Sequence, residues 1–371
     1  MKFSINKNTL LTKLQLLSKA TPSRSTLPIL GSALFTQKNK TLNIRATDLE
    51  ISINLNCDIE NGEDGCVAIP LRKLLEITSA LPDTKINFTI SDIGKINIEC
   101  NSGQYTIMGQ PNEEFPTEQN IENSQEFIVS ASELKDIIAN TSYAASRDDL
   151  KPVLQGVLFQ IDKKGVVSVA TDGHRLVKFE KKHLHSLDYT GSVVVPIKFL
   201  SLLISQLQEE GEISILIGKN HIQVQLESAL ITSRIIKDPY PDYEGVIPKD
   251  NTKTFVVNRD SFTEAIKRVS IFSNKSSRQV ALELSENSVT ISTEDPENIT
   301  TGKETLECDY DGDPMTIGYN AFYLKEVLQH ESSDEIKILL QSPLKAGLFV
   351  PMDQSDNNNK TTLLMPIRLN D

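Results

Sequence analysis

The sequence has few of the features that mark a secreted, membrane-spanning or metal-binding protein. It contains four cysteines in 371 residues, which are too few for a disulfide framework and lack the spacing of metal ligands. No apolar run approaches the roughly 18 residues that a membrane-spanning helix needs. Lysines and polar residues interrupt the leucines near the N-terminus, so no secretory signal is expected there. These absences predict a soluble cytoplasmic protein with no membrane partner.

Cofactor and nucleotide motifs are missing as well. There is no Walker A motif, no dinucleotide-type glycine fingerprint and no G-x-S-x-G elbow. His183 and His185 have no Cys or His at ligand spacing. Residues 309–313 (DYDGD) begin like a calcium loop, but Pro314 and Asn320 stand where that loop needs Gly and Glu. A turn is therefore expected at 309–313, and neither a metal nor a cofactor is expected.

The first 47 residues contain no Asp or Glu. They carry eight Lys and Arg in a chain whose net charge is −12, so the remaining residues carry −20. The total weighs against a nucleic-acid partner. Two interpretations of the basic segment stay open, namely chance clustering on solvated faces or one basic surface on an otherwise repelling body.

A threefold repeat organises the chain. Strand-like runs begin at Phe3, Phe127 and Phe255, and each leads into a polar helix start and then apolar residues at the i, i+4 spacing of one helix face. The first two copies stay in step at an offset of 124 residues, so that 28–35 matches 152–159 and 47–48 matches 171–172. The third copy reaches the corresponding position at 293–294.

Each copy has a second half of similar form, with a strand-to-helix junction near residue 70, 196 or 320. The strands that follow alternate apolar and polar residues, so each should have one buried face and one solvent-exposed face. One third of the length is about 124 residues, a typical domain size. The sequence therefore predicts an α+β fold of three repeated domains, 1–122, 123–249 and 250–371, each of two strand-helix-strands halves.

The helices should bury one apolar stripe each. In the first helix the expected inward residues are Leu10, Leu11, Leu14 and Leu17, with Lys13 exposed. In the third domain they are Phe262, Ile266 and Val269, with Lys267 exposed.

Residues 171–176 (TDGHRL) are the best candidates for chemistry, with Asp172 and His174 as an acid/base pair and Arg175 as an anion clamp. The Thr-Asp pair recurs in the first copy without a histidine, however. A recurring pair of this kind is typical of a turn at a strand end, where Asp accepts backbone N–H groups. The Gly-His-Arg run occurs in the second copy only and is the better functional candidate.

Four motifs and the repeat resemble one family over essentially the whole chain. The motifs are TLPILG at 26–31, ATDGHRL at 170–176, YPDY at 240–243 and MPIRL at 365–369. Together they resemble the bacterial DNA polymerase III beta subunit family, the sliding clamps. The resemblance implies three α+β domains per subunit and a head-to-tail homodimer that closes into a six-domain ring, with helices lining the hole.

Such a ring is expected to encircle double-stranded DNA without reading its sequence, to tether the polymerase III alpha subunit and to perform no bond chemistry. The DNA-facing residues that the resemblance implies are Arg24, Arg72, Arg147, Lys151 and Lys198. Lys13 is expected to join the lining, whereas Lys38 and Lys40 look like a hairpin loop.

The family also implies a groove for short, partly apolar peptides of polymerases, the clamp loader and repair proteins. Its matching residues in the second domain and the following linker are Leu154, Thr171, Gly173, His174, Arg175, Leu176, Pro241 and Val246. Those in the third domain are Asn320, Tyr323, Pro343, Leu344, Met365, Pro366, Ile367 and Arg368. The dimer interface is expected at Gln104, Tyr105 and Ile107 on one side and at Ile271 and Phe272 on the other.

Some positions depart from the family pattern. Gly245 stands where many members have Arg, and Pro152 and Val153 replace aromatic residues near the DNA. Residues 353–360 look like a solvated loop, and Asn370 and Asp371 extend beyond the usual end. Two other functions stay open, an enzyme that uses Asp172, His174 and Arg175, and a peptide-binding scaffold unrelated to DNA.

Overall fold

The computed structural model describes residues 1–22, 24–59, 62–118, 121, 124–182, 184, 189–355 and 357–369. By its packing the chain forms two compact units, Met1–Val129 with Gly211–Ile235, and Ser130–Glu210 with Ile236–Asp371. The expected domain boundary at 122/123, the loop histidines His183 and His185, and the extension Asn370–Asp371 lie outside the described residues. No helix in the described ranges is long and apolar enough to cross a membrane.

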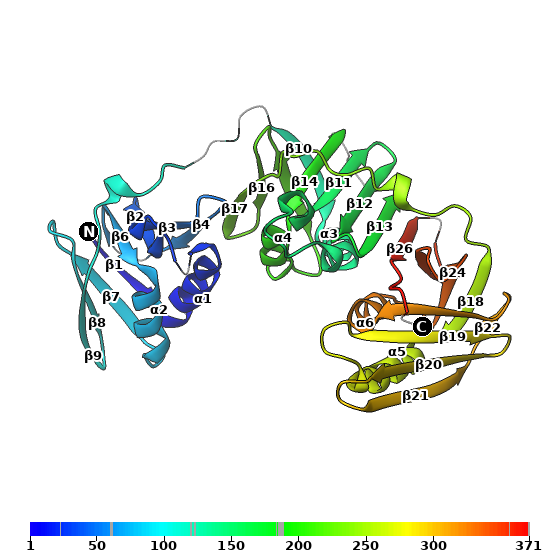
Figure 1. Ribbon diagram of the computed structural model, residues 1–371. Coiled ribbons are helices and arrows are strands. Elements are labelled where there is room, and N and C mark those ends of the chain that lie inside the picture. Colours follow the sequence, from blue (N-terminus) through cyan, green and yellow to red (C-terminus); the bar gives the residue numbers. More distant parts are fainter. Residues whose placement is uncertain are drawn as a thin grey trace. The chain divides into compact units, whose positions relative to one another are not determined.

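Among its described residues the first unit contains two α-helices and two sheets, and most of their elements are labelled in Figure 1. Its helices are α1 (Lys7–Leu17) and α2 (Leu71–Ala80). A five-stranded sheet has the order β5 (Gly62–Glu63), β1 (Lys2–Asn6), β7 (Lys85–Ile90), β8 (Lys95–Cys100) and β9 (Gly103–Met108). An eight-stranded sheet has the order β10 (Gln125–Ser130), β15 (Glu212–Ile217), β16 (His221–Gln225), β17 (Ala229–Arg234), β4 (Ile51–Asp58), β3 (Thr41–Thr47), β2 (Ser32–Lys38) and β6 (Gly65–Pro70).

In the part of the second unit that the structure describes there are four α-helices, α3 (Ala131–Thr141), α4 (Ile197–Ile204), α5 (Arg259–Val269) and α6 (Ala321–Gln329). A nine-stranded sheet has the order β14 (Gly191–Pro196), β11 (Gly156–Asp162), β12 (Gly165–Thr171), β13 (Arg175–Lys182), β26 (Asn358–Leu364), β25 (Gly347–Pro351), β24 (Glu335–Leu340), β18 (Lys253–Asn258) and β22 (Asp309–Tyr310). A four-stranded sheet has the order β21 (Thr300–Glu307), β20 (Ser288–Asp295), β19 (Gln279–Ser285) and β23 (Met315–Asn320).

All six predicted strand-to-helix junctions are present. Asn6, Ser130 and Asn258 cap α1, α3 and α5, and each side chain accepts a hydrogen bond from a backbone N–H in the first turn. The second junctions lead into α2, α4 and α6 directly from β6, β14 and β23. The α+β class is therefore confirmed at the level of these elements.

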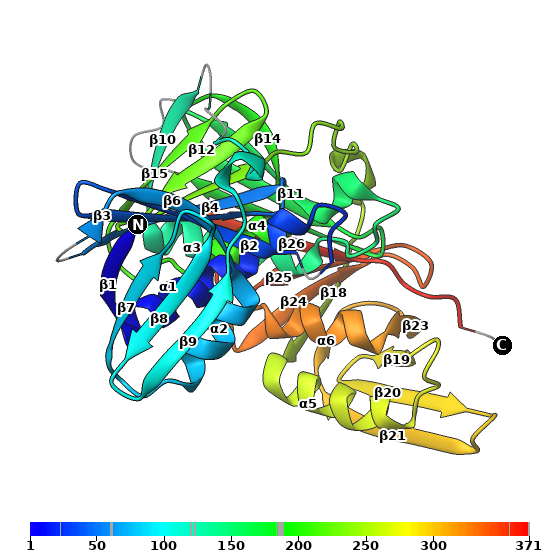
Figure 2. The ribbon, with the colours of Figure 1, turned by 90° about the vertical axis from the view of Figure 1, so that its left-hand side faces the viewer.

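The helices bury the stripes that their spacing predicts, with two exceptions in α1. Phe262, Ile266 and Val269 of α5 are buried, and Figure 2 shows α5 and α6 side by side against the sheet of β19, β20 and β21. In α1, however, Leu11 is only half-buried. Lys13 is not exposed as expected, because its Nζ donates to the carbonyl of Asn56 on β4 at 3.0 Å.

Three further segments are predicted from the sequence to be turns or loops. Asn39 and Lys40 both have positive φ, 49° and 64°, so they form the tight hairpin turn between β2 and β3 that the sequence predicts. Residues 311–314 connect β22 to β23, but the prediction of a turn over 309–313 is wrong at its start, because Asp309 and Tyr310 form β22 and pair with β18. The prediction of a solvated loop over 353–360 is wrong at its end, because β26 begins at Asn358 and Lys360 is buried beside Glu331.

Candidate functional site

One end of the nine-stranded sheet gathers three segments that are distant in the sequence. Arg175 at the start of β13 pairs with Leu364 at the end of β26, and Leu364 pairs in turn with Gly347 at the start of β25. The chain continues across this end, because the N–H of Met365 donates to the carbonyl of His174 at 2.9 Å and that of Ile367 to Gly318 at 2.9 Å. The turn at 171–174, the loop at 341–346 and the tail at 365–368 therefore meet at one place, which we call the sheet-end groove.

The floor of the sheet-end groove is apolar. Leu158, Val169, Leu176 and Leu363 are buried in one cluster, and the linker residue Tyr240 packs against it. The Tyr240 hydroxyl donates to the carbonyl of Val169 at 3.4 Å, and burial raises the pKa of that hydroxyl. Leu154 is half-buried, so Leu176 belongs to the core more fully than Leu154 does.

Several apolar side chains around the same end of the sheet stay exposed. Leu344 of the loop and Met365 of the tail are 64% and 44% exposed, and Pro343 is exposed next to Leu344. In the linker, Val246 is 58% exposed and Pro241 is exposed as well. Exposed apolar side chains grouped in this way mark an interaction site more often than isolated ones do. A buried apolar floor with an exposed apolar rim suits a partly apolar peptide.

The turn that begins the groove is built by Thr171 and Asp172. The Asp172 Oδ1 accepts from the backbone N–H groups of His174 at 2.8 Å and Arg175 at 3.0 Å. In the first unit Asp48 accepts in the same way from Glu50 and Ile51. The prediction of a recurring strand-end turn is thus confirmed for these two copies.

In the third copy the position is shifted. Thr293 and Glu294 remain within β20, and Asp295 makes the turn by accepting from the N–H of Glu297. The strand therefore runs two residues further than in the other copies before it turns.

Arg175 lies at the centre of a buried polar cluster rather than on the rim. Its side chain is 5% exposed, and its guanidinium donates to Glu326 at 2.6 Å and to the Tyr143 carbonyl at 2.7 Å. Asp172 lies 3.3 Å from its Nε. The ring of Tyr323 lies against the guanidinium, with the Cζ atom 5.0 Å from the ring centroid. These contacts hold the turn to α6.

His174 is exposed, and its ring stacks on that of Tyr323 with centroids 5.4 Å apart. Both line a cleft of about 280 Å³ together with Arg147 and Lys151. The structure thus brings two of the expected DNA-facing residues beside two of the expected groove residues. Asn320 has a structural part, since it caps α6 and donates to the Ser277 carbonyl at 3.2 Å.

Asp172 and His174 interact with different parts of the protein. The Asp172 carboxylate is engaged by two backbone N–H groups and by Arg175, and the His174 ring is engaged by Tyr323. No hydrogen bond joins the carboxylate to the ring in these two described residues. Both side chains are thus engaged in contacts within the protein, the carboxylate in the turn and the ring in the aromatic stack.

The sequence did not reveal the residues that surround Arg175. Tyr143 stacks on His330 with ring centroids 3.7 Å apart, and Lys360 lies 3.2 Å from the carboxylate of Glu331. Burial raises the pKa of Glu331 and lowers that of Lys360, while their pairing opposes both shifts. No short-range spacing connects these residues, because the two pairs join elements that are far apart in the sequence.

Comparison with known proteins decides the family. The chain matches the DNA polymerase III beta subunit in its N-terminal domain over residues 1–119, its central domain over 128–242 and its C-terminal domain over 244–368. The chain belongs to the DNA polymerase III beta subunit family. It is 30% identical to the beta sliding clamp of Pseudomonas aeruginosa and 28% identical to that of Vibrio cholerae, over 100% of each chain.

Solved structures of sliding clamps agree over the whole length. A Pseudomonas aeruginosa clamp bound to griselimycin has a TM-score of 0.92 at 30% identity, and a Bacillus subtilis clamp has a TM-score of 0.93 at 25% identity. Each comparison covers 100% of both chains. The fold and the full-length family membership are therefore established together.

The cations that sliding-clamp membership points to are exposed in their own units. Arg24 and Arg72 belong to the first unit, and the Arg72 side chain is 93% exposed with its Nε 3.4 Å from Glu76. Arg147, Lys151 and Lys198 belong to the second unit, where Lys198 lies on α4. Taken together, the six α-helices contain ten Lys and Arg against six Asp and Glu, a net charge of +4 in a chain of −12.

The residues expected at a clamp's subunit interface lie on or beside two outer strands. Gln104, Tyr105 and Ile107 are on β9, the last strand of the five-stranded sheet. Ile271 and Phe272 are exposed and lie beside β21, the last strand of the four-stranded sheet. The Phe272 carbonyl accepts from the Thr300 hydroxyl at 3.1 Å, which fixes this segment to β21.

Proposed function

We propose that two copies of this chain close head to tail into a ring around double-stranded DNA and tether the polymerase III alpha subunit. The chain acts as a non-catalytic processivity subunit in the cytoplasm, built of clamp domains 1–122, 123–249 and 250–371. The observation that carries this proposal is the full-length match to all three domains of the beta subunit. The two strand-to-helix junctions in each repeat also support the proposal.

The unpaired outer strands support the ring. β9 and β21 each have a neighbour on one side only among the described strands, and exposed edges of this kind need a cover. A closed two-fold ring covers both edges with one type of contact used twice. The contact joins β9 of one protomer to β21 of its partner, with Tyr105 and Phe272 as its apolar side chains.

The distribution of charge supports a sliding contact with DNA. The positively charged helices attract phosphates, and the acidic remainder of the chain repels DNA. Phosphate contacts carry no sequence information, so a ring held by them can move along the duplex. Arg24, Arg72, Arg147, Lys151 and Lys198 are the residues proposed for these contacts.

The sheet-end groove is the proposed docking site for peptides of the alpha subunit, the clamp loader, other polymerases and repair proteins. Val246, Leu344 and Met365 supply its exposed apolar surface, and His174 with Tyr323 supplies an aromatic wall. Gly245 stands where many family members have Arg, so the groove lacks that polar side chain.

Topological trapping tests the proposal directly. The protein is loaded onto nicked circular DNA by a clamp loader with ATP, and the circle is then cut once. A ring stays on the intact circle in high salt and leaves after the cut. Retention on the linear product that depends on salt contradicts the ring, because it indicates ordinary electrostatic binding.

The subunit interface has its own test. Tyr105→Asp with Phe272→Asp should convert the dimer to a monomer, measured by sedimentation at micromolar concentration, because two charges would be buried at each contact. Leu150→Asp is the control, since Leu150 is exposed and lies on neither outer strand. A double variant that remains dimeric would place the interface elsewhere.

A further inference from the structure

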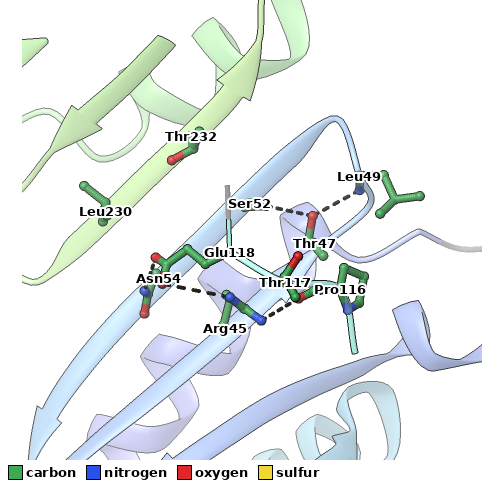
Figure 3. Close-up of a pocket in the computed structure, with 10 residues that line it drawn as sticks. All are labelled: Arg45, Thr47, Leu49, Ser52, Asn54, Pro116, Thr117, Glu118, Leu230 and Thr232. Carbon is green, nitrogen blue, oxygen red and sulfur yellow. Dashed lines mark hydrogen bonds and ion pairs between the residues drawn. The ribbon is translucent and has the colours of Figure 1, made fainter. Parts of the chain in front are cut away.

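The first unit repeats the backbone arrangement of the sheet-end groove, and Figure 3 shows this first-unit copy. The turn at 47–50 follows β3 as the turn at 171–174 follows β12. β17 pairs with β4 as β26 pairs with β13, with Ser233 opposite Ile51 and Leu364 opposite Arg175. A linker crosses each copy, and Pro116 follows Phe115 in one as Pro241 follows Tyr240 in the other. The fold therefore supplies two places for a groove in each chain.

The floors of the two places differ in chemistry. At the offset of 124 residues, Arg45 of β3 corresponds to Val169 of β12, and Ser52 of β4 corresponds to Leu176 of β13. Val169 and Leu176 are buried apolar floor residues of the sheet-end groove. A guanidinium and a hydroxyl in their places make this part of the first-unit copy polar, while Phe115 of the linker packs in an apolar cluster with Ile29, Leu30 and Ala68.

Arg45 holds the linker down over this polar floor. Its Nη2 donates to the Pro116 carbonyl at 2.5 Å, its Nη1 lies 4.0 Å from the Glu118 carboxylate, and its Cζ lies 5.3 Å from the Phe115 ring centroid. Asn54 fixes the same carboxylate by donating to it at 3.0 Å. Figure 3 shows these side chains converging on the linker from β3 and β4.

Almost no free volume remains under the linker. The Arg45 side chain is 12% exposed, and the cavity that it shares with Thr47, Ser52 and Thr232 measures about 20 Å³. A volume of this size holds about one water molecule. It has no room for a peptide side chain.

We propose that Arg45 is a specificity-determining residue that limits each chain to one peptide groove, by holding residues 115–118 in the first-unit copy of the site. Val169 and Leu176 give the second copy an apolar floor, whereas Arg45 and Ser52 give the first copy a polar floor on which Arg45 binds the chain's own linker. The inference rests on the proposed peptide-binding function of the sheet-end groove.

The test uses the full-length protein and a synthetic peptide that carries the clamp-binding segment of the cognate alpha subunit. Calorimetry should give one peptide per chain for the native protein. The Arg45→Val, Ser52→Leu variant reproduces the apolar floor of the sheet-end groove. It should bind a second peptide per chain, with a lower affinity than the first. Amide exchange at Phe115, whose N–H donates to the Asn112 carbonyl at 3.1 Å, should rise about tenfold, because the bonds that hold the linker are lost.

A matched control is Arg234→Val, which removes an exposed arginine that pairs with Glu50 beside the same turn. It should keep one peptide per chain and native exchange of the linker. One peptide per chain in the double variant, with its thermal unfolding cooperative, overturns the inference. No binding to the native protein overturns instead the proposed function on which the inference rests.

Discussion

At the residue scale, Arg175 has a more structural role than its motif indicates. Its guanidinium is surrounded by Glu326, Asp172 and the Tyr143 carbonyl, and its side chain is almost fully buried. The motif suggested an anion clamp, and the family resemblance implied that Arg175 is a residue of the peptide groove. Asp172 is a local partner, but Glu326 on α6 and Tyr143 in the segment after α3 are far from residue 175 in the sequence, and no local spacing connects them to it.

Replacing Arg175 should therefore destabilise the second unit strongly. Arg175→Met leaves Glu326 and the Tyr143 carbonyl without their donor, which we expect to lower the free energy of unfolding by about 3 kcal/mol. Urea denaturation measures the change. Arg234→Met is the comparison, because that arginine is exposed and should cost less than about 1 kcal/mol. Equal losses in the two variants would show that Arg175 does not act through its buried contacts.

His330 should make stability depend on pH. Burial against Tyr143 lowers the pKa of its imidazole below the ordinary value, and the nearby Lys360 and Arg175 add to the shift while Glu326 opposes it. As the pH falls below about 6.5, the unfolded chain takes up a proton that the folded chain accepts only at lower pH. The free energy of unfolding should therefore decrease on acidification through this window.

The variant His330→Phe isolates that effect because it keeps a ring for Tyr143 to stack on. Between about pH 7.5 and pH 5.5 it should lose less stability than the native protein, by a few tenths of a kcal/mol since the imidazole is only half-buried. Thermal unfolding at the two pH values measures the difference. Identical losses would assign the pH dependence to other groups.

At the element scale, the sequence predicted the features that depend on residues close together in the chain. A cap such as Asn6, a strand and a helix stripe all lie within about twenty residues, so their pattern was sufficient to place six helices. The pairings of β4 with β17 and of β13 with β26 join strands far apart in the chain. Period-2 alternation says which face of a strand is buried but not which strand lies beside it, so these pairings and the groove that they form could not be predicted from the residues alone.

The equivalent helix starts give a direct test at this scale. Asn258 caps α5 by accepting from the Ser261 N–H at 3.0 Å. Asn258→Ala should lower the free energy of unfolding by about 1 kcal/mol, because that N–H loses its acceptor. Asn258→Asp keeps the acceptor and should restore most of the loss in chemical denaturation. A loss that persists in the Asp variant would point to the amide group, which donates to the Asp334 carbonyl.

At the scale of the whole molecule, the net charge of −12 is less informative than its distribution. The helices carry +4, so the remainder of the chain carries −16. Even within the acid-free first 47 residues the cations have different tasks. Lys13 is engaged by the carbonyl of Asn56, Arg45 holds the linker, and Lys40 forms a hairpin turn with Asn39. Arg24 is left exposed in a loop.

Two pairs of substitutions separate the total charge from its position. Arg24→Ala with Arg72→Ala, and Lys38→Ala with Lys40→Ala, each remove two exposed cations from the first unit and change the net charge from −12 to −14. Only the arginine pair is proposed to face DNA. We expect it to reduce the amount of protein loaded on nicked circles by about threefold, since each lost phosphate contact weakens binding to every sequence alike. The lysine pair should load like the native protein. Because the two variants have the same total charge, equal loading would mean that position does not matter, and a loss confined to the arginine pair can come only from where those charges lie.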